Sequence, residues 1–178
     1  KEKDSVSKTM QSGWLTMGPK TLEFENKFKK YIGSKYAVSL NSATAALHLA
    51  LNAIGVKEND EVILPTNTFV ATAEVVVYSG AQPVLCDIDT KDHNINVDLI
   101  DRLITPRTKA IIPVHFGGHP CKMDEILNIS SRYNIKIIED AAHALPSKYK
   151  GKKIGTIADA TCFSFYATKT LTTGEGGM

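Results

Sequence analysis

The sequence has 178 residues, of which 43% are hydrophobic and 22% are charged, and these proportions are typical of one globular domain of ordinary size. Its net charge of +2 is too small to indicate a nucleic-acid partner or an anionic membrane surface. No apolar run reaches the length that a membrane-spanning helix needs, so the sequence predicts no membrane partner.

The three cysteines, Cys86, Cys121 and Cys162, are odd in number, widely spaced and free of any C-x-x-C motif. This usage argues against a disulfide framework and for a reducing compartment. The polar N-terminus contains no apolar signal core, so we expect a cytoplasmic protein. Cys86 and Cys162 lie inside apolar runs and are expected to be small core residues.

Helix-like and strand-like segments alternate along the chain from residue 21 onward. In chain order, we expect a helix at 21–33, a strand at 36–40, a helix at 43–55, a strand at 61–65, a helix at 68–80, a strand at 83–88, a helix at 97–104, a strand at 109–116, a helix at 122–134, a strand at 135–140 and a strand at 160–165. The polar, basic interval 147–157 interrupts this rhythm and is interpreted as an exposed excursion or hairpin.

Several of the strand-like runs are apolar on consecutive residues instead of on alternate ones. That pattern is typical of parallel strands that are buried on both faces. The repetition of strand, helix and strand therefore predicts an α/β sheet with right-handed crossovers.

The ends of these predicted strands are unusually polar. The first runs into "NSATAAL" and the second into "PTNTF", while the fifth ends at Asp140 and continues to His143, and the sixth leads to Ser164 and Lys169. Ligands of open α/β sheets bind beyond the carboxyl ends of the strands. We therefore expect these distant segments to share one rim.

At the first of these ends, Ser42 or Ala43 precedes a helix whose first turn contains Thr44, Ala45 and Ala46. Such a turn presents unpaired backbone N–H groups and the positive end of the helix dipole, and its small side chains allow an anion to approach. An ordinary Ser or Thr cap is the commoner meaning of the same pattern. Neither a G-x-G-x-x-G motif nor a P-loop is present.

Two further residues of the rim also have alternative interpretations. Asp140 lies where a buried strand meets the rim, and a carboxylate there needs a cation or hydrogen-bond donors, although it could simply cap a helix at "AAHAL". Phe69 follows the second strand and could stack on a flat ligand or be a core aromatic.

Lys169 stands between the apolar run "FSFYAT" and the flexible stretch "TLTTGEGG". A lysine in a confined apolar site loses its proton more readily than one in water, and the neutral amine forms a Schiff base with an aldehyde. Pyridoxal 5'-phosphate (PLP) needs such a lysine, a carboxylate at its ring nitrogen, a phosphate cradle and a stacking wall. The rim contains candidates for all four.

The sequence closely resembles the PLP-dependent sugar aminotransferases of the DegT/DnrJ/EryC/StrS family. The resemblance runs from "SGWLTMGPKTLEFENKF" through "NSATAALHLAL", "DEVILPTNTFVATA", "GAQPVLCDID" and "ITPRTKAIIPVHFGG" to "IIEDAAHA" and "FSFYATKTLTTGEGG". It implies the aspartate-aminotransferase type fold, a three-layer α/β/α arrangement with a mostly parallel, mixed sheet. The usual "SGTAAL" of the family reads "SATAAL" here, with Ala43 in place of glycine.

The resemblance also implies roles for individual residues. Lys169 bonds to the cofactor and later moves a proton, Asp140 pairs with the ring nitrogen, and His143 lies near the phenolic oxygen. Phe69 stacks on the ring, and Ser164 donates to the phosphate. The phosphate-binding turn comprises Ser42, Ala43, Thr44 and Ala45.

The implied reaction is transamination in two half-reactions. Glutamate donates its amino group to the cofactor, which passes it to a keto group of a nucleotide-linked sugar, with a 4-keto-6-deoxy sugar of surface polysaccharides as the expected acceptor. Lys169 argues against the subset of the family that has histidine at this position and performs deoxygenation.

The resemblance further predicts how the chain is organised. Residues 1–34 are expected to form an N-terminal segment and helix bordering the active site, near Trp14 and Gly18, and residues 35–178 the PLP-binding large domain, incomplete at its C-terminus. Family members continue for about a hundred or more residues. We therefore expect the C-terminal small domain to be absent, and the 178-residue piece alone to be incompetent as an aminotransferase.

The segment after "GEGGM" is expected to form an antiparallel strand between the strands at 160–165 and 36–40. The active species is then a longer chain that works as a homodimer.

Two rival interpretations remain. One is a metal site at His115, His119 and Cys121, which lacks a fourth ligand at a standard spacing, and the other is a non-catalytic or regulatory protein that keeps the fold.

Overall fold

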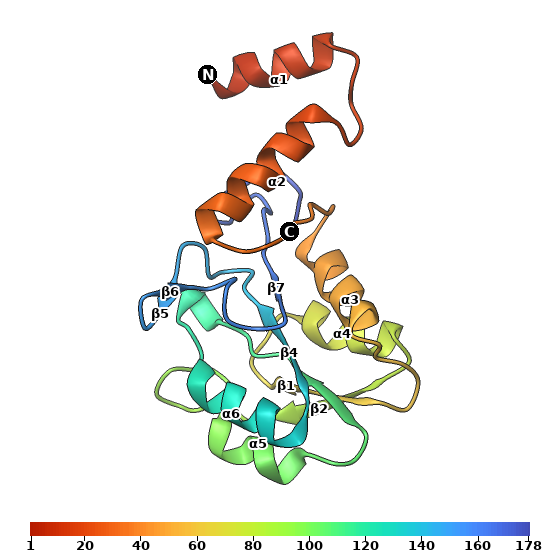
Figure 1. Ribbon diagram of the computed structural model, residues 1–178, viewed down its shortest axis with the longest axis vertical. Coiled ribbons are helices and arrows are strands. Elements are labelled where there is room, and N and C mark those ends of the chain that lie inside the picture. The colour runs from red at the N-terminus through yellow and green to blue at the C-terminus, as the bar shows by residue number, and fades with distance from the viewer.

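A five-stranded sheet forms the centre of the molecule, in the order β2-β1-β3-β4-β7. The computed structural model describes residues 1–178, and Figure 1 shows the sheet with helices packed around it. The strands are β1 (Glu61–Pro65), β2 (Gln82–Cys86), β3 (Thr108–Ile111), β4 (Lys136–Asp140), β5 (Lys148–Tyr149), β6 (Lys152–Lys153) and β7 (Ala160–Cys162). The helices are α1 (Glu2–Gln11), α2 (Pro19–Ile32), α3 (Ala43–Ala53), α4 (Val70–Tyr78), α5 (Val97–Leu103), α6 (Met123–Tyr133) and the 3-10 helix η1 (Phe116–Gly118).

All neighbouring strands of this sheet run parallel, and the sheet has one helical layer on each face. Helices α3 and α4 cover one face, where Leu51, Val75 and Ile138 belong to one buried cluster. Helices α5 and α6 cover the other, where Ile100 and Ile126 belong to a second cluster. The prediction of a three-layer α/β/α fold with a mostly parallel sheet is confirmed.

The strand expected at 36–40 is the one that the structure does not form. Residues 35–39 have no regular structure, and Leu40 makes a single antiparallel bridge, with Gly177. A strand needs a ladder of hydrogen bonds to a neighbour, and here only one residue finds a partner. The strand expected at 109–116 is interrupted after Ile111, since Pro113 has no N–H group to donate, and the pairing resumes as a single parallel bridge between Val114 and Asp140.

The end of the chain lies between two segments that are far apart in sequence. Gly177 bridges Leu40 on one side and Ser164 on the other, antiparallel to both. The N–H groups of Leu40 and Gly177 each donate to the carbonyl oxygen of the other residue at 2.9 Å. Gly177 thus runs antiparallel to both of these segments, whereas the strand expected after "GEGGM" lies outside the described residues.

The polar interval 147–157 contains the expected hairpin, since β5 and β6 pair in antiparallel fashion. Its turn residues, Lys150 and Gly151, both have positive φ angles, of 47° and 83°. Two such residues in succession match the tight turns that join short antiparallel strands. The residues of the turn itself therefore favour the hairpin.

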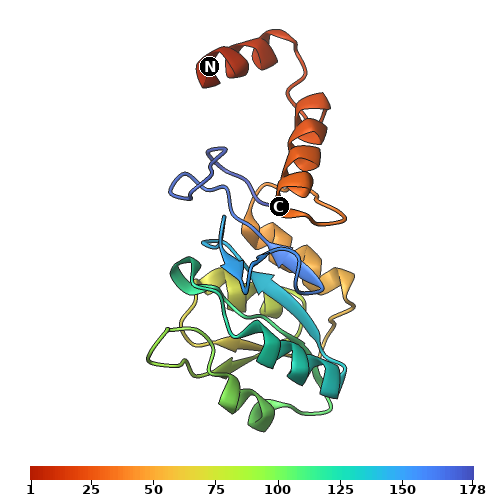
Figure 2. The ribbon, with the colours of Figure 1, turned by 60° about the vertical axis from the view of Figure 1, so that its left-hand side comes forward.

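The N-terminal helices extend away from the sheet (Figure 2). Helix α2 packs Phe28 against Phe163 and Phe165, which follow β7. It ends at Gly33 with φ 93°, as expected for a left-handed C-terminal glycine. Helix α1 was not expected from its polar sequence, and none of its residues is buried. No helix of the structure combines the length and the apolar character needed to cross a membrane.

Candidate active site

A cavity of about 500 Å³ opens at the carboxyl ends of the strands. Its wall combines the start of α3, the loop between β1 and α4, and the segments that follow β3, β4 and β7. Eight of the nine predicted site residues line it: Ser42, Ala43, Thr44, Phe69, Asp140, His143, Ser164 and Lys169. The ninth, Ala45, does not line the cavity.

The start of α3 supplies free backbone donors to this cavity. Ser42 caps the helix, and its hydroxyl accepts a hydrogen bond from the Ala45 N–H at 3.1 Å. The N–H groups of Ala43 and Thr44 have no acceptor within the protein. A helix N-terminus with two free amides beside a cavity attracts an anion. Because the cap occupies the Ala45 amide, the candidate anion site centres on Ala43 and Thr44.

Gly177 passes close to the first turn of α3. A Cβ atom on Gly177 would lie 2.3 Å from the carbonyl carbon of Ser42 and 2.5 Å from the Ala43 nitrogen. Only glycine therefore allows the end of the chain to pass so close to the first turn of α3. Ser164, which pairs with Gly177, accepts from the Tyr166 N–H at 3.3 Å, so its hydroxyl proton remains free to donate.

Asp140 ends β4 and is only 5% exposed. Its Oδ2 accepts from the Thr72 hydroxyl at 2.8 Å and its Oδ1 from the Ala142 N–H at 3.1 Å. Asp140 forms no ion pair within 4.0 Å, and residues 141–145 form turns instead of the helix that it could have capped. The carboxylate is thus held by neutral donors and keeps acceptor capacity toward the cavity.

Lys169 lies on the loop after β7, where its backbone N–H donates to the Tyr166 carbonyl at 2.9 Å. Burial lowers the pKa of the Lys169 amine below its usual 10.5, and the charge of Asp140 opposes this shift. The pKa of His143 is likewise lowered from 6.5, first by burial and then by the charge of Lys169, with Asp140 again opposing. A lysine that loses its proton easily and a neutral histidine therefore face the same cavity.

Phe69 is 75% exposed although it is a large apolar residue. It precedes α4 and lines the cavity, so the alternative that it is a core aromatic is wrong. An exposed ring on the wall of a polar cavity suits a flat ligand that stacks on it.

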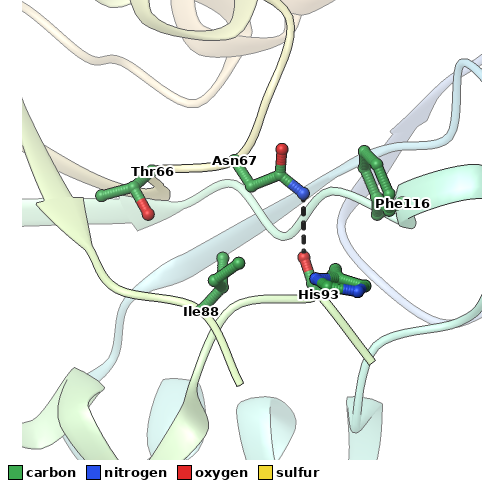
Figure 3. A pocket seen from close by; sticks show the side chains of 5 residues that line it. All are labelled: Thr66, Asn67, Ile88, His93 and Phe116. Atoms are coloured by element: carbon green, nitrogen blue, oxygen red, sulfur yellow. Dashed lines mark hydrogen bonds between the residues drawn. The ribbon is translucent and has the colours of Figure 1, made fainter. Parts of the chain in front are cut away.

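A second pocket, of about 480 Å³, adjoins the cavity and shares Asn67 and Phe116 with it (Figure 3). Its remaining walls are Thr66, Ile88 and His93. The Asn67 amide donates to the His93 carbonyl across a long 3.4 Å, and the rings of His93 and Phe116 are 6.0 Å apart. Hydroxyl, amide and imidazole groups beside an aromatic ring suit a polar ring-shaped ligand.

The histidine and cysteine group considered as a metal site is not assembled. His115 is buried, its Nε2 lies 3.1 Å from Glu139 Oε1, and its Nδ1 accepts from the Cys121 N–H at 3.1 Å. No group of three or more potential metal ligands exists in the structure, and His119 is exposed.

Thr72 is not among the residues that the sequence predicts for the site. This residue is fully buried on α4, a helix that is otherwise almost wholly apolar, and it contacts Asp140 from 68 positions away. Its only sequence signal is a hydroxyl inside "VATAEVVVY", four residues after Thr68.

Trp14 and Gly18, which are expected near the site entrance, line a separate hollow at the N-terminal helices.

The model of the DegT/DnrJ/EryC1/StrS aminotransferase family matches residues 1–178. An uncharacterized protein of Methanocaldococcus jannaschii is 62% identical over 177 residues, which cover 99% of this chain and 46% of that protein. GDP-perosamine synthase of Caulobacter vibrioides is 48% identical over 178 residues, covering 99% of this chain and 48% of the synthase.

Among solved structures, Spr1654 of Streptococcus pneumoniae in its PLP form has a TM-score of 0.95 and 42% identity. The match covers 99% of this chain and 49% of that one. The chain thus spans about half the length of the curated relatives and of the solved structure that it matches.

Proposed function

The chain belongs to the DegT/DnrJ/EryC1/StrS aminotransferase family, and from this premise we propose that it acts in PLP-dependent transfer of an amino group from glutamate to a keto group of a nucleotide-linked sugar. The observation that carries the proposal is the convergence of four features on one cavity. They are the Lys169 amine with its lowered pKa, the Asp140 carboxylate with a free acceptor site, the free amides at the start of α3, and the exposed Phe69 ring.

These features fit PLP group by group. The amides of Ala43 and Thr44 and the hydroxyl of Ser164 are free donors for a phosphate. Phe69 offers a face for a flat ring. Asp140 is an acceptor for a protonated ring nitrogen. When bound, PLP supplies an aldehyde that captures amines and a ring that withdraws electrons.

The protein's own groups perform the rest. The Lys169 amine binds the cofactor and then acts as the base and acid that moves a proton at the substrate carbon. Asp140 would hold a proton on the ring nitrogen. His143, whose pKa is lowered, would donate or accept a hydrogen bond at the phenolic oxygen without adding a charge.

The substrate class rests on the relatives and on the second pocket. The name GDP-perosamine synthase indicates a nucleotide-linked product. The pocket of Asn67, His93 and Phe116 provides polar groups and an aromatic wall for a sugar ring next to the cofactor. We place a 4-keto-6-deoxy sugar of surface polysaccharide synthesis there.

We further propose that the protein works as a cytoplasmic homodimer, with residues 1–34 bordering the site and residues 35–178 forming its PLP-binding domain. Three buried free thiols suit a reducing compartment. The large exposed apolar side chains of α4, Val77 and Tyr78, suit a covering partner.

The proposal is tested on the complete gene product loaded with PLP. Glutamate alone should convert the absorbance of bound PLP to that of the amine form and release one 2-oxoglutarate for each site. Subsequent addition of a nucleotide-linked 4-keto-6-deoxy sugar should restore the first spectrum. A protein that binds PLP but never exchanges its amine with glutamate would instead support the non-catalytic alternative.

A further inference from the structure

Thr72 joins Asp140 to the wall of the cavity through two short hydrogen bonds. Its side chain is fully buried, with Oγ1 at 2.8 Å from Asp140 Oδ2 and 2.7 Å from the hydroxyl oxygen of Thr68. Thr68 lines the cavity, whereas Thr72 does not. Thr72 thus acts on any ligand only through its neighbours.

The direction of these bonds follows from the chemistry of the groups. An ionised carboxylate only accepts hydrogen bonds, so the single hydroxyl proton of Thr72 is donated to Asp140. The Thr72 oxygen must then accept the proton of Thr68. A chain of donors therefore runs from Thr68 through Thr72 to Asp140.

This series of hydrogen bonds fixes the orientation of the Asp140 carboxylate. Asp140 Oδ2 is held from α4 by Thr72, and Oδ1 is held from the following turn by the Ala142 N–H at 3.1 Å. Rotation of the carboxylate would break at least one of these bonds, and both donors are neutral. The remaining acceptor capacity is consequently presented to the cavity in one fixed direction.

We propose that Thr72 is a positioning residue that aims the Asp140 carboxylate at the ring nitrogen of the cofactor. The inference rests on the proposed function, because it presupposes that this cavity binds PLP. Part of the site's preference for a protonated ring nitrogen would then come from Thr72, a helix residue that does not line the cavity.

The test compares two ligands on the complete gene product: PLP and an analogue in which a C–H group replaces the ring nitrogen. Dissociation constants are measured for the wild type, Thr72→Val and Thr72→Ser. Thr105→Val is the matched control, because Thr105 donates to the carboxylate of Glu61 at the opposite end of the sheet. Thermal unfolding of each variant confirms that it is folded.

The wild type should bind PLP more tightly than the analogue. Thr72→Val should reduce this preference by about tenfold, since one hydrogen bond to a charged group is lost, while Thr72→Ser and Thr105→Val should stay within about twofold of the wild type. Thr72→Val also deprives a buried acceptor of its donor without changing the side-chain shape.

Each other outcome contradicts one defined part of the account. An unchanged preference in Thr72→Val overturns the positioning role, and an equal loss of affinity for both ligands shows that Thr72 serves only packing. A wild type that binds PLP and the analogue equally tightly overturns the role of Asp140 and, with it, the inference about Thr72. A wild type that binds neither ligand overturns the proposed function itself.

Discussion

Two buried carboxylates at opposite ends of the sheet differ in how completely they are paired. Glu61 begins β1, where it accepts from Thr105 and Thr108 and forms an ion pair with Arg107. The hydrogen bond from Thr105 is the main cause that lowers the Glu61 pKa below its usual 4.5. Asp140 ends β4, where it accepts from a threonine hydroxyl and one backbone amide and has no cation in an ion pair.

The two carboxylates differ in how many of their acceptor sites are used by protein groups, and this difference distinguishes a structural carboxylate from a candidate catalytic one. The Glu61 carboxylate has three protein partners, one of them a cation, and lines neither of the two pockets at the carboxyl ends of the strands. Asp140 faces a cavity with part of its bonding capacity unused, in the company of Lys169 and His143. Loss of Glu61 should therefore affect stability, and loss of Asp140 should affect chemistry.

The largest effect is expected for Lys169→Ala. Because this variant loses the proposed cofactor-binding amine and the proposed base, half-transamination with glutamate should slow by about 10⁴-fold. Stopped-flow absorbance measures the rate. Lys148→Ala, on the exposed hairpin, is the control and should retain the wild-type rate.

Asp140→Asn should come next, with a loss on the order of 10²-fold in the same half-reaction. Asparagine still accepts from Thr72 and keeps the fold, but it cannot stabilise a proton on the ring nitrogen. PLP should remain bound, as measured by absorbance after gel filtration. Near-wild-type turnover would show that Asp140 serves only the local turn.

Glu61→Gln should destabilise the fold by about 1–3 kcal/mol at neutral pH and leave the half-reaction rate unchanged. The folded-state pKa of Glu61 is depressed, so its stabilisation is complete above its usual value of 4.5 and is lost as the pH falls through the folded pKa. Urea unfolding of the variant and the wild type should therefore converge in acid. An equal gap at pH 7 and well below 4.5 would contradict the assignment.

His93→Ala should raise the KM for the nucleotide-linked sugar by about three- to tenfold, because one polar wall of the second pocket is removed. The glutamate half-reaction, which leaves this pocket free, should be unaffected. A matched rise in the KM for glutamate would show that the pocket serves the whole site instead of the sugar.

The smallest effect concerns the pH at which Lys169 becomes reactive. Burial lowers its pKa and the Asp140 charge raises it, so Asp140→Asn should lower the Lys169 pKa further. The pH dependence of Lys169 modification by an amine-reactive reagent in the PLP-free protein should shift toward lower pH. A shift toward higher pH would contradict the coupling between the two residues.

Much of this arrangement could be predicted from sequence, because its causes are local. Apolar runs such as 61–65 and 135–140 identify buried parallel strands, and the polar residues that follow them gather at one rim. The sequence predicts that Ser42 or Ala43 precedes a helix, and Ser42 is the cap of α3. The turn at Lys150 and Gly151 follows from a short, glycine-containing polar sequence.

The parts that could not be predicted depend on partners distant in sequence. The hydrogen bond from Thr72 to Asp140 joins residues 68 positions apart, and no sequence pattern near either residue predicts it. The saturation of the Ala45 amide by Ser42 depends on one side-chain rotamer. Helix α1 buries no residue, so no apolar periodicity marked it.

Borohydride reduction of the PLP-loaded protein followed by peptide mapping tests the central claim most directly. The reagent makes the bond between the cofactor and a lysine permanent, so the labelled peptide identifies the lysine. We expect the pyridoxyl label on Lys169 in the wild type and in Asp140→Asn, and no specific label in Lys169→Ala. A label on Lys148 or Lys150 of the hairpin would contradict the assignment of this cavity as the active site.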